Sequence, residues 1–385
     1  MPATTRSAAV ATPYEPGVVL RIHNHVPPRP FGGGYGPLPR DAAPVWQKNG
    51  QPCDRVVSDC VAFALDNPPI ETKPPGGEEH TFTITGTKTL RRFSVDSGGA
   101  HVVTGYVDGK KATVYVAKIY DGVYYPIGDS GPDRDCMLLA DQDYTLESWA
   151  YETMQGVEGV AHKLVPTCYD CWTFSLATNQ PGRRRWVRML VLEFVQGETM
   201  LAKMLRATEN DDVRYPLLPP EEFRLRVFKN LWEAEISIWW DAEVSHYDLE
   251  PRNVMVRDDG TVALIDFNRA IVFRFYRREH PKYFEGAPKL PVSPITRCWP
   301  FPPVGNIIAD PGHHGNPWAN WIPESWLQNK ELAAEWLLQT WKGDLGKKYR
   351  VLGDDFLNHE AHKQRSRNVL AMLEELGRKP ADNNK

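Results

Sequence analysis

The sequence has no long hydrophobic run, few cysteines and no strong excess of one charge. No apolar stretch reaches the roughly 18 residues that a transmembrane helix needs, so we expect no membrane span. The first residues, MPATTRSAAVATPYEPG, lack the continuous apolar segment of a secretory signal, which favours a cytoplasmic protein. A formal net charge of −4 gives no general attraction to nucleic acids or anionic membranes.

The chain has only six cysteines, and without a secretory signal we expect most of them to be reduced thiols. Cys168 and Cys171 form a CxxC motif, which is typical of half a zinc site or of a redox pair. No second CxxC or HxxxH motif lies nearby, and two ligands cannot complete a tetrahedral zinc site. We interpret the pair as two packed thiols beside Trp172.

The composition is that of a globular protein, with 42% hydrophobic and 24% charged residues. A length of 385 residues exceeds a typical single domain and favours two lobes or domains. Proline and glycine are frequent in residues 1–79, where only the segment that starts at Cys53 has the apolar spacing of a short helix. We therefore interpret residues 1–79 as an N-terminal extension.

An alternating pattern begins at His80 and predicts antiparallel strands. The segments HTFTITGTKTLRRFSV, HVVTGYV and ATVYVAKIYD alternate β-branched and aromatic residues with polar ones, and turn residues separate them. Helical spacing follows in residues 144–156, and WVRMLVLEFV predicts a further strand. These segments predict a β-rich lobe at residues 80–196.

The pattern becomes helical after residue 197. Apolar residues recur with a period near 3.6 over residues 221–244, which predicts an amphipathic helix. The segments NVMVRDD and GTVALIDF predict two short strands joined by an Asp-Gly turn. Further helices are predicted at residues 330–343 and 357–376. We assign residues 197–350 to a helical lobe and residues 351–385 to a C-terminal helix and tail.

The strongest chemical signal is HYDLEPRNVMV at residues 246–256, followed by VALIDFNRA at residues 262–270. Asp248 and Asn253 lie five positions apart on a loop, and Asp266 ends the second strand of the hairpin that follows. We therefore predict that the three side chains converge around one cation. Asp266 and the amide oxygen of Asn253 are hard ligands suited to magnesium, which leaves Asp248 as a base.

The HxDLxxxN motif, followed by a strand that ends in Asp-Phe, resembles the catalytic loop and metal-binding turn of the protein kinase-like superfamily. The resemblance implies an α+β, two-lobed kinase-like fold, with a small antiparallel β-rich lobe and a larger helical lobe. It also implies a transferase that uses ATP and magnesium. In that enzyme Asp248 would be the catalytic base, and Asn253 and Asp266 would bind the metal.

Upstream segments resemble the same family in the expected order. ATVYVAKIYD resembles the strand whose lysine binds the nucleotide phosphates, which makes Lys118 the candidate. Glu147 in LESWAYETM resembles the helix glutamate that pairs with this lysine, and Glu152 is the alternative. VLEFVQGE resembles the hinge, so Glu193 and Phe194 would lie by the adenine.

The sequence also departs from the family pattern. No GxGxxG motif precedes Lys118, so Gly98 and Gly99 are the candidates for a phosphate-covering loop. Asn268 occupies the position where such kinases usually have glycine. Glu250 occupies the position where protein-serine kinases usually have lysine, and a carboxylate there would repel a γ-phosphate unless it binds a metal or a cationic substrate.

Three functions are compatible with these motifs. The first is an ATP- and magnesium-dependent phosphotransferase that acts on a hydroxyl group of a small molecule or a protein. The second is a different enzyme of fungal secondary metabolism on the same fold, because the Trp- and Pro-rich residues 290–326 resemble the tail of fungal kinase-like proteins. The third is a non-catalytic pseudokinase that acts as a binding module.

The second function has one concrete example, a synthase that uses aminoacyl-tRNA to make arginine-containing cyclic dipeptides. Asp248 and Glu250 would bind the guanidinium group of the arginine substrate. The basic cluster at residues 183–188 would contact tRNA phosphates. The DDxxE motif that we associate with such synthases is absent from the sequence.

Overall fold

In the computed structural model, the described residues are 13–40, 47–48, 51–52, 57–70, 76–87, 99–125, 135–203, 218–298 and 318–352. The chain forms two compact units. The first comprises residues 1–162, 166–195 and 266–278, and the second comprises residues 163–165, 196–265 and 279–385.

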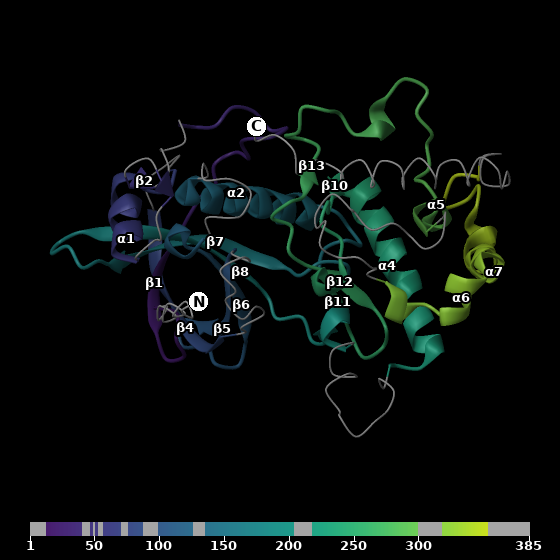
Figure 1. The fold of residues 1–385 in the computed structure, drawn as a ribbon, viewed down its shortest axis with the longest axis horizontal. Coiled ribbons are helices and arrows are strands. Elements are labelled where there is room, and N and C mark those ends of the chain that lie inside the picture. Colours follow the sequence, from purple (N-terminus) through teal and green to yellow (C-terminus); the bar gives the residue numbers. More distant parts are fainter. Residues whose placement is uncertain are drawn as a thin grey trace, which may run out of the picture. The chain divides into compact units, whose positions relative to one another are not determined.

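Six strands of the first unit form a closed antiparallel barrel (Figure 1). They pair in the order β1-β4-β5-β6-β8-β7, and pairing of β7 with β1 closes the barrel. The strands are β1 (Val19–Asn24), β4 (Gly76–Thr87), β5 (His101–Val107), β6 (Tyr115–Tyr120), β7 (Cys168–Ala177) and β8 (Arg184–Glu193).

The inside of the barrel is hydrophobic because successive side chains of a strand point to opposite faces. In β1, for example, Leu20 and Ile22 are buried while Val19 and Arg21 are exposed. Burial of these apolar side chains is the main favourable contribution to folding of the unit. The core cluster also includes Tyr14, Phe82, Ile84, Val103, Ala117, Ile119, Trp172, Phe174, Val187, Met189 and Val191.

The long helix of the first unit, α2 (Cys136–Gln155), lies beside the barrel and contacts β6, β7 and β8 (Figure 1). Asp135 caps this helix, since its carboxylate accepts hydrogen bonds from the backbone N–H groups of Met137 and Leu138, both at 3.0 Å. The helix predicted at residues 144–156 therefore starts earlier than expected. The other elements are α1 (Val57–Asp66), the hairpin of β2 (Gln47–Lys48) and β3 (Gln51–Pro52), and β13 (Ile271–Val272).

The second unit contains a three-stranded antiparallel sheet with the order β12-β11-β9. The predicted hairpin is confirmed: Val254 pairs with Leu264, and Gly260 takes a positive φ of 84° at its turn. The strands of this unit are β9 (Glu198–Thr199), β10 (Val244–Ser245), β11 (Val254–Val256) and β12 (Val262–Leu264).

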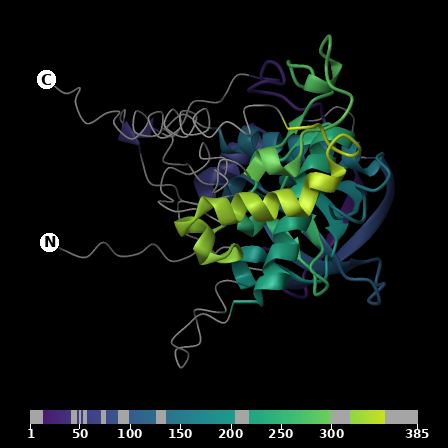
Figure 2. The ribbon, with the colours of Figure 1, turned by 90° about the vertical axis from the view of Figure 1, so that its right-hand side faces the viewer.

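The helices of the second unit are drawn in Figure 2. Aromatic side chains are buried among them. They are α4 (Glu221–Asp241), α5 (Pro294–Cys298), α6 (Glu324–Gln328) and α7 (Lys330–Trp341). Helix α4 contacts β12 and α5, and α5 contacts α7. Trp318 and Trp341 are fully buried, and the rings of Trp232 and Trp318 lie 5.9 Å apart. The helices predicted at residues 221–244 and 330–343 are confirmed, whereas the one predicted at residues 357–376 lies outside the described residues.

The predicted two-lobed kinase-like fold is wrong. In place of a small β-rich lobe before a large helical lobe, the described chain has a closed six-stranded antiparallel barrel and few helices. The barrel begins with β1, which lies inside the segment interpreted as an N-terminal extension. Alternation of side chains predicts that a segment is a strand, but it does not say which distant strands meet. The contact that closes the barrel, between β1 and β7, has no local signal in the sequence.

Among the described residues, no helix has the length and hydropathy needed to cross a bilayer.

Candidate functional site

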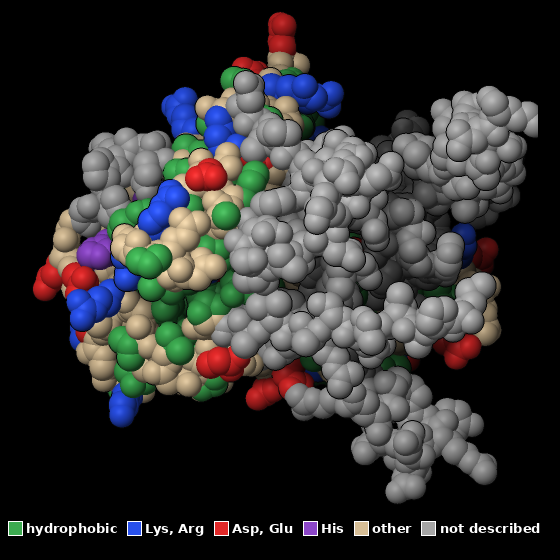
Figure 3. Space-filling model, turned by 60° about the vertical axis from the view of Figure 1, so that its left-hand side comes forward, with side chains coloured by type: hydrophobic (Ala, Val, Ile, Leu, Met, Phe, Trp, Pro, Cys, Tyr) green, Lys and Arg blue, Asp and Glu red, His purple; other side chains and the backbone are tan. Residues whose placement is uncertain are grey.

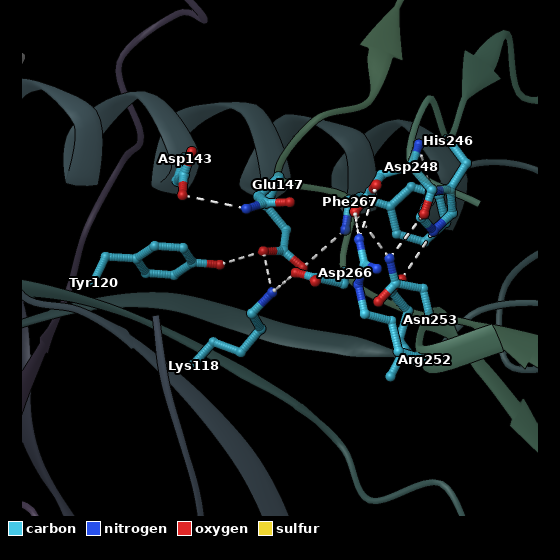
Figure 4. Close-up of polar contacts among 12 residues, drawn as sticks. Lys118, Tyr120, Asp143, Glu147, His246, Asp248, Arg252, Asn253, Asp266 and Phe267 are labelled. Atoms are coloured by element: carbon cyan, nitrogen blue, oxygen red, sulfur yellow. Dashed lines mark hydrogen bonds and ion pairs between the residues drawn. The ribbon is translucent and has the colours of Figure 1, made fainter. Parts of the chain in front are cut away.

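Lys118 is the centre of a charged cluster in the first unit. It is buried in β6, and its Nζ donates to Glu147 Oε2 at 2.5 Å and to Asp266 Oδ1 at 2.7 Å. Burial by itself lowers the pKa of Lys118, but the negative charges of Asp266 and Glu147 outweigh it and raise the pKa above its ordinary value. The ammonium group is therefore charged at neutral pH. Figure 4 shows the Lys118 side chain extending from its strand toward α2.

Glu147 connects three parts of the first unit from its position on α2. Its side chain is fully buried, and Oε2 accepts hydrogen bonds from Lys118 and from the hydroxyl of Tyr120 at 2.6 Å. Oε1 accepts the backbone N–H of Phe267 at 3.1 Å. Burial raises the pKa of Glu147 and the charge of Lys118 opposes this shift. Glu152, the alternative partner of the lysine, instead pairs with Arg274 at 2.6 Å.

Asp266 is the most accessible charged group of this cluster, with 32% of its side chain exposed against 10% for Lys118. Its φ of 70° lies in the left-handed region, which aspartate tolerates better than most residues. Phe267, the next residue, is fully buried, and its ring packs edge-on against Tyr151 at 5.4 Å. The anchored Phe267 keeps the carboxylate of Asp266 next to the lysine.

Asp143 is a fourth charged residue near this cluster, and the sequence interpretation missed it. It precedes Glu147 by one helical turn, so both side chains lie on one face of α2. Asp143 Oδ2 accepts hydrogen bonds from Asn268 Nδ2 and from the Tyr125 hydroxyl, each at 3.2 Å. Burial raises the pKa of Asp143 to about 7, with the negative charge of Asp266 also raising it and the hydrogen bond from Asn268 lowering it. Asn268, which departs from the kinase pattern, thus hydrogen-bonds to Asp143 on α2.

Gly34 and Tyr35, near the N-terminus, contact the residues that follow Asp266. The hydroxyl of Tyr35 donates to Ala270 O at 2.7 Å and accepts the backbone N–H of Val272 at 2.9 Å. Gly34 packs so closely on Tyr276 that a Cβ atom at Gly34 would lie 1.9 Å from the ring. A side chain at Gly34 would therefore collide with this tyrosine. Nothing local in the Gly-rich sequence FGGGYG indicated this contact.

The second unit contains the loop that carries Asp248 and Asn253. Asn253 Nδ2 donates to the backbone oxygen of Asp248 at 2.8 Å and to its Oδ2 at 3.1 Å. His246 Nδ1 accepts the backbone N–H of Asp248 at 3.3 Å, so its Nε2 carries the proton and donates to Ile265 O at 2.9 Å. These bonds give the loop one defined conformation before any ligand binds.

Arg252 pairs with both acidic side chains of this loop. Its Nη2 lies 3.1 Å and 3.0 Å from the two carboxylate oxygens of Asp248, and its Nη1 contacts Glu250. The guanidinium group therefore compensates the negative charge of Glu250. The sequence interpretation considered a metal or a cationic substrate as the partner of Glu250 and overlooked Arg252, two positions away.

Of the remaining predicted residues, Glu193 bonds to Thr167 and not to the charged cluster of Lys118. Glu193 ends β8, and its Oε2 accepts the backbone N–H of Thr167 at 3.0 Å and the hydroxyl of Thr167 at 2.9 Å. Phe194 follows it and is half-buried. A Cβ atom at Gly99 would meet nothing within 4 Å, so no packing requires glycine there. Gly98 lies outside the described residues.

The predicted convergence of Asp248, Asn253 and Asp266 around one cation stays a prediction, since Asp266 belongs to the first unit and the other two to the second. Within the described ranges, no group of three or more His, Cys, Asp and Glu side chains could hold a metal. The individual donors do suit magnesium. Asn253 has an amide oxygen and Asp266 has a carboxylate, and magnesium binds both kinds of donor.

No protein-family model matches the chain, and no curated protein matches it.

Proposed function

We propose that this protein is a phosphotransferase that uses ATP and magnesium and acts on a hydroxyl group of a small molecule or a protein. The observation that carries the proposal is the contact of buried Lys118 with Glu147 and Asp266. A lysine that is kept charged and oriented by a buried glutamate is suited to bind nucleotide phosphates. Asp266 then supplies an accessible carboxylate beside it.

The charge balance of this cluster supports a cation. One ammonium group faces two carboxylates, so Lys118, Glu147 and Asp266 together carry a net negative charge when all are ionised. Such an excess is costly in a partly buried site, and a bound cation would offset it. Asp266 is the more exposed of the two carboxylates and is the group that would hold magnesium. Bound magnesium would neutralise charge on the transferring phosphoryl group.

The residues of the chain have distinct roles in this proposal. Lys118 would move from Asp266 to phosphate oxygens, while Glu147 and the hydroxyl of Tyr120 keep it oriented. Asp248 keeps its predicted role, which is to orient the acceptor hydroxyl and accept its proton. The hydrogen bonds from Arg252 to Asp248 would fix the carboxylate in one rotamer for that task.

Nucleotide binding tests the proposal directly. Thermal unfolding of the purified protein is measured with and without ATP and magnesium, in the wild type and in Lys118→Met, Asp266→Asn and Glu152→Gln. We expect ATP with magnesium to raise the melting temperature of the wild type and of the Glu152→Gln control. The melting temperatures of Lys118→Met and Asp266→Asn should not change when ATP and magnesium are added. A wild-type protein that neither gains stability nor transfers phosphate from ATP contradicts the proposal and favours the non-catalytic binding module or the synthase.

The aminoacyl-tRNA-dependent synthase receives less support from the residues predicted to serve it. Arg185 is buried and donates to both carboxylate oxygens of Asp121, and buried Arg188 donates to Thr173 Oγ1 at 2.7 Å. These two arginines of the basic cluster therefore face partners inside the protein. On the described part of the surface in Figure 3, Lys and Arg side chains are interspersed with Asp and Glu, which is unlike a tRNA-binding face.

Asp248 and Glu250, the predicted binding residues for a substrate arginine, also give the synthase little support. Asp248 and Glu250 do bind a guanidinium group, but it is that of Arg252. A substrate arginine would have to displace it. Incubation of the protein with charged tRNA and amino acids, followed by mass spectrometry for a diketopiperazine, separates this synthase from the phosphotransferase.

A further inference from the structure

The CxxC motif occupies an irregular part of β7. Residues three apart on a regular strand point to opposite faces of a sheet. Between Cys168 and Asp170, however, the strand contains a bulge: Cys168 pairs with Leu192 and Cys171 pairs with Leu190. The two cysteines therefore oppose residues two positions apart on β8 and share one face.

The two thiols are close enough to react. Both residues are half-buried, and the thiol of Cys171 is near enough to that of Cys168 to raise its pKa. Two residues along a strand span about 6.6 Å, which is within the range of roughly 4.4 to 6.8 Å between the Cα atoms of a disulfide. The other described cysteines, Cys60, Cys136 and Cys298, are buried.

The surroundings favour thiol chemistry over a metal site. The described residues offer no group of three His, Cys, Asp and Glu side chains that could complete a metal site with the pair. On the α2 side, Gln155 Nε2 donates to the backbone oxygen of Cys168. The pair therefore lies against the helix that carries Glu147.

We propose that Cys168 and Cys171 form a reversible intramolecular disulfide when the protein meets a small-molecule disulfide such as oxidised glutathione. The proposal does not depend on the proposed phosphotransferase activity. It rests on the bulge that turns both thiols to one face of β7 and on the short span of strand that separates them.

The reaction proceeds in two exchanges. The deprotonated sulfur of Cys171 attacks one sulfur of oxidised glutathione, the S–S bond of glutathione breaks, and one glutathione thiolate leaves and takes up the proton. Deprotonated Cys168 then attacks the sulfur of Cys171 in the mixed disulfide, and the second glutathione leaves in the same way. Two protein thiols are oxidised, and one glutathione disulfide is reduced to two thiols.

The order of attack follows from the environment of Cys168. Its contact with Cys171 raises the pKa of the Cys168 thiol, and burial and the charge of Asp170 raise it further. A thiol that holds its proton is a poor first nucleophile. Cys168 therefore acts as the resolving cysteine, when the mixed disulfide is already beside it.

Peptide mass spectrometry of the full chain tests the proposal. The reduced protein is incubated with oxidised glutathione, remaining thiols are blocked with an alkylating agent, and the peptide that contains both cysteines is analysed. We expect this peptide to lose the mass of two hydrogen atoms, to resist alkylation, and to regain both thiols after reduction with dithiothreitol.

Two variants define the mechanism further. Cys168→Ser should stop at the glutathione adduct on Cys171, and Cys171→Ser should remain mostly unmodified. Cys298→Ser, which removes a buried thiol elsewhere, should form the disulfide like the wild type. Wild-type protein in which both cysteines are still alkylated, or in which glutathione stays attached, overturns the proposal.

Discussion

Phe267 donates its backbone N–H to Oε1 of Glu147 at 3.1 Å, and the other oxygen of the same carboxylate binds Lys118. One buried side chain thus positions the lysine and the segment that carries Asp266. This relationship links the stability of the first unit to the geometry of the candidate site, because any change at Glu147 affects both.

We expect Glu147→Gln to lower the free energy of unfolding by about 3 kcal/mol, since it removes the charge that compensates a buried ammonium group. Urea-induced unfolding measures this loss. Glu152→Gln on the same helix breaks a largely exposed pair with Arg274 and should cost less than about 1 kcal/mol. Equal losses in the two variants would show that the buried pair does not stabilise the unit.

Asp143 predicts a pH dependence of stability. Its pKa rises from 3.8 to about 7 on folding, so the folded protein holds this proton more tightly than the unfolded chain. The resulting stabilisation is complete below the unfolded pKa and is lost as the pH rises from about 4 to about 7. Asp143→Asn keeps the acceptor oxygen for Asn268 but cannot titrate.

The test compares the free energy of unfolding of wild type and Asp143→Asn at about pH 5 and about pH 8. As the pH rises from about 5 to about 8, the free energy of unfolding of the wild type should fall by on the order of 2 kcal/mol relative to that of the variant. Each pKa unit is worth about 1.4 kcal/mol, and the full value is reduced because the side chain of Asp143 is only half-buried. A difference between the two proteins that is independent of pH would disprove the raised pKa.

Arg252→Met should destabilise the loop of the second unit, because it leaves Asp248 and Glu250 as adjacent carboxylates without their cation. The guanidinium group is 28% exposed, so we expect a loss of only about 1 kcal/mol. Glu250→Gln in the Arg252→Met background should recover part of the loss. Chemical unfolding of both single variants and the double variant measures the coupling, and strictly additive effects would rule out the pairing.

Tyr35→Phe should loosen the segment that follows Asp266. The change removes the hydroxyl that binds Ala270 and Val272, and we expect a loss of about 1 to 3 kcal/mol because both backbone groups lose a partner. Hydrogen exchange at the Val272 amide should become faster. Tyr169→Phe, at a side chain that is 51% exposed, is the matched control and should leave both measurements unchanged.

Elements with a strong local period could be predicted from the sequence. The apolar stripe of α4, the alternation in β6 and the Asp-Gly turn between β11 and β12 each depend on residues that are close in the chain. The order of motifs also led to Lys118 and Glu147, whose side chains the structure brings together.

Several features were missed, and only some of them depend on distant contacts. The strand β1 was hidden in a Pro- and Gly-rich region, and Asp135 as the cap of α2 was not recognised. The pairing of Arg252 with Glu250 was overlooked, and Tyr35 lies far in sequence from the Ala270 backbone that it binds. The cap at Asp135 and the pair of Arg252 with Glu250 are local contacts that a reading of the sequence could have found. The pairing of β1 with β7 and the bonds of Tyr35 depend instead on how separate segments meet.

The amino-acid sequence by itself determined the local helices and strands and the set of charged residues from which Lys118, Glu147 and Asp266 come. Only the tertiary structure decided that six strands close into a barrel and that one lysine receives two carboxylates from separate segments. The physical reason is that backbone preferences act over a few residues, whereas closure and charge pairing depend on burial shared by segments far apart in the chain.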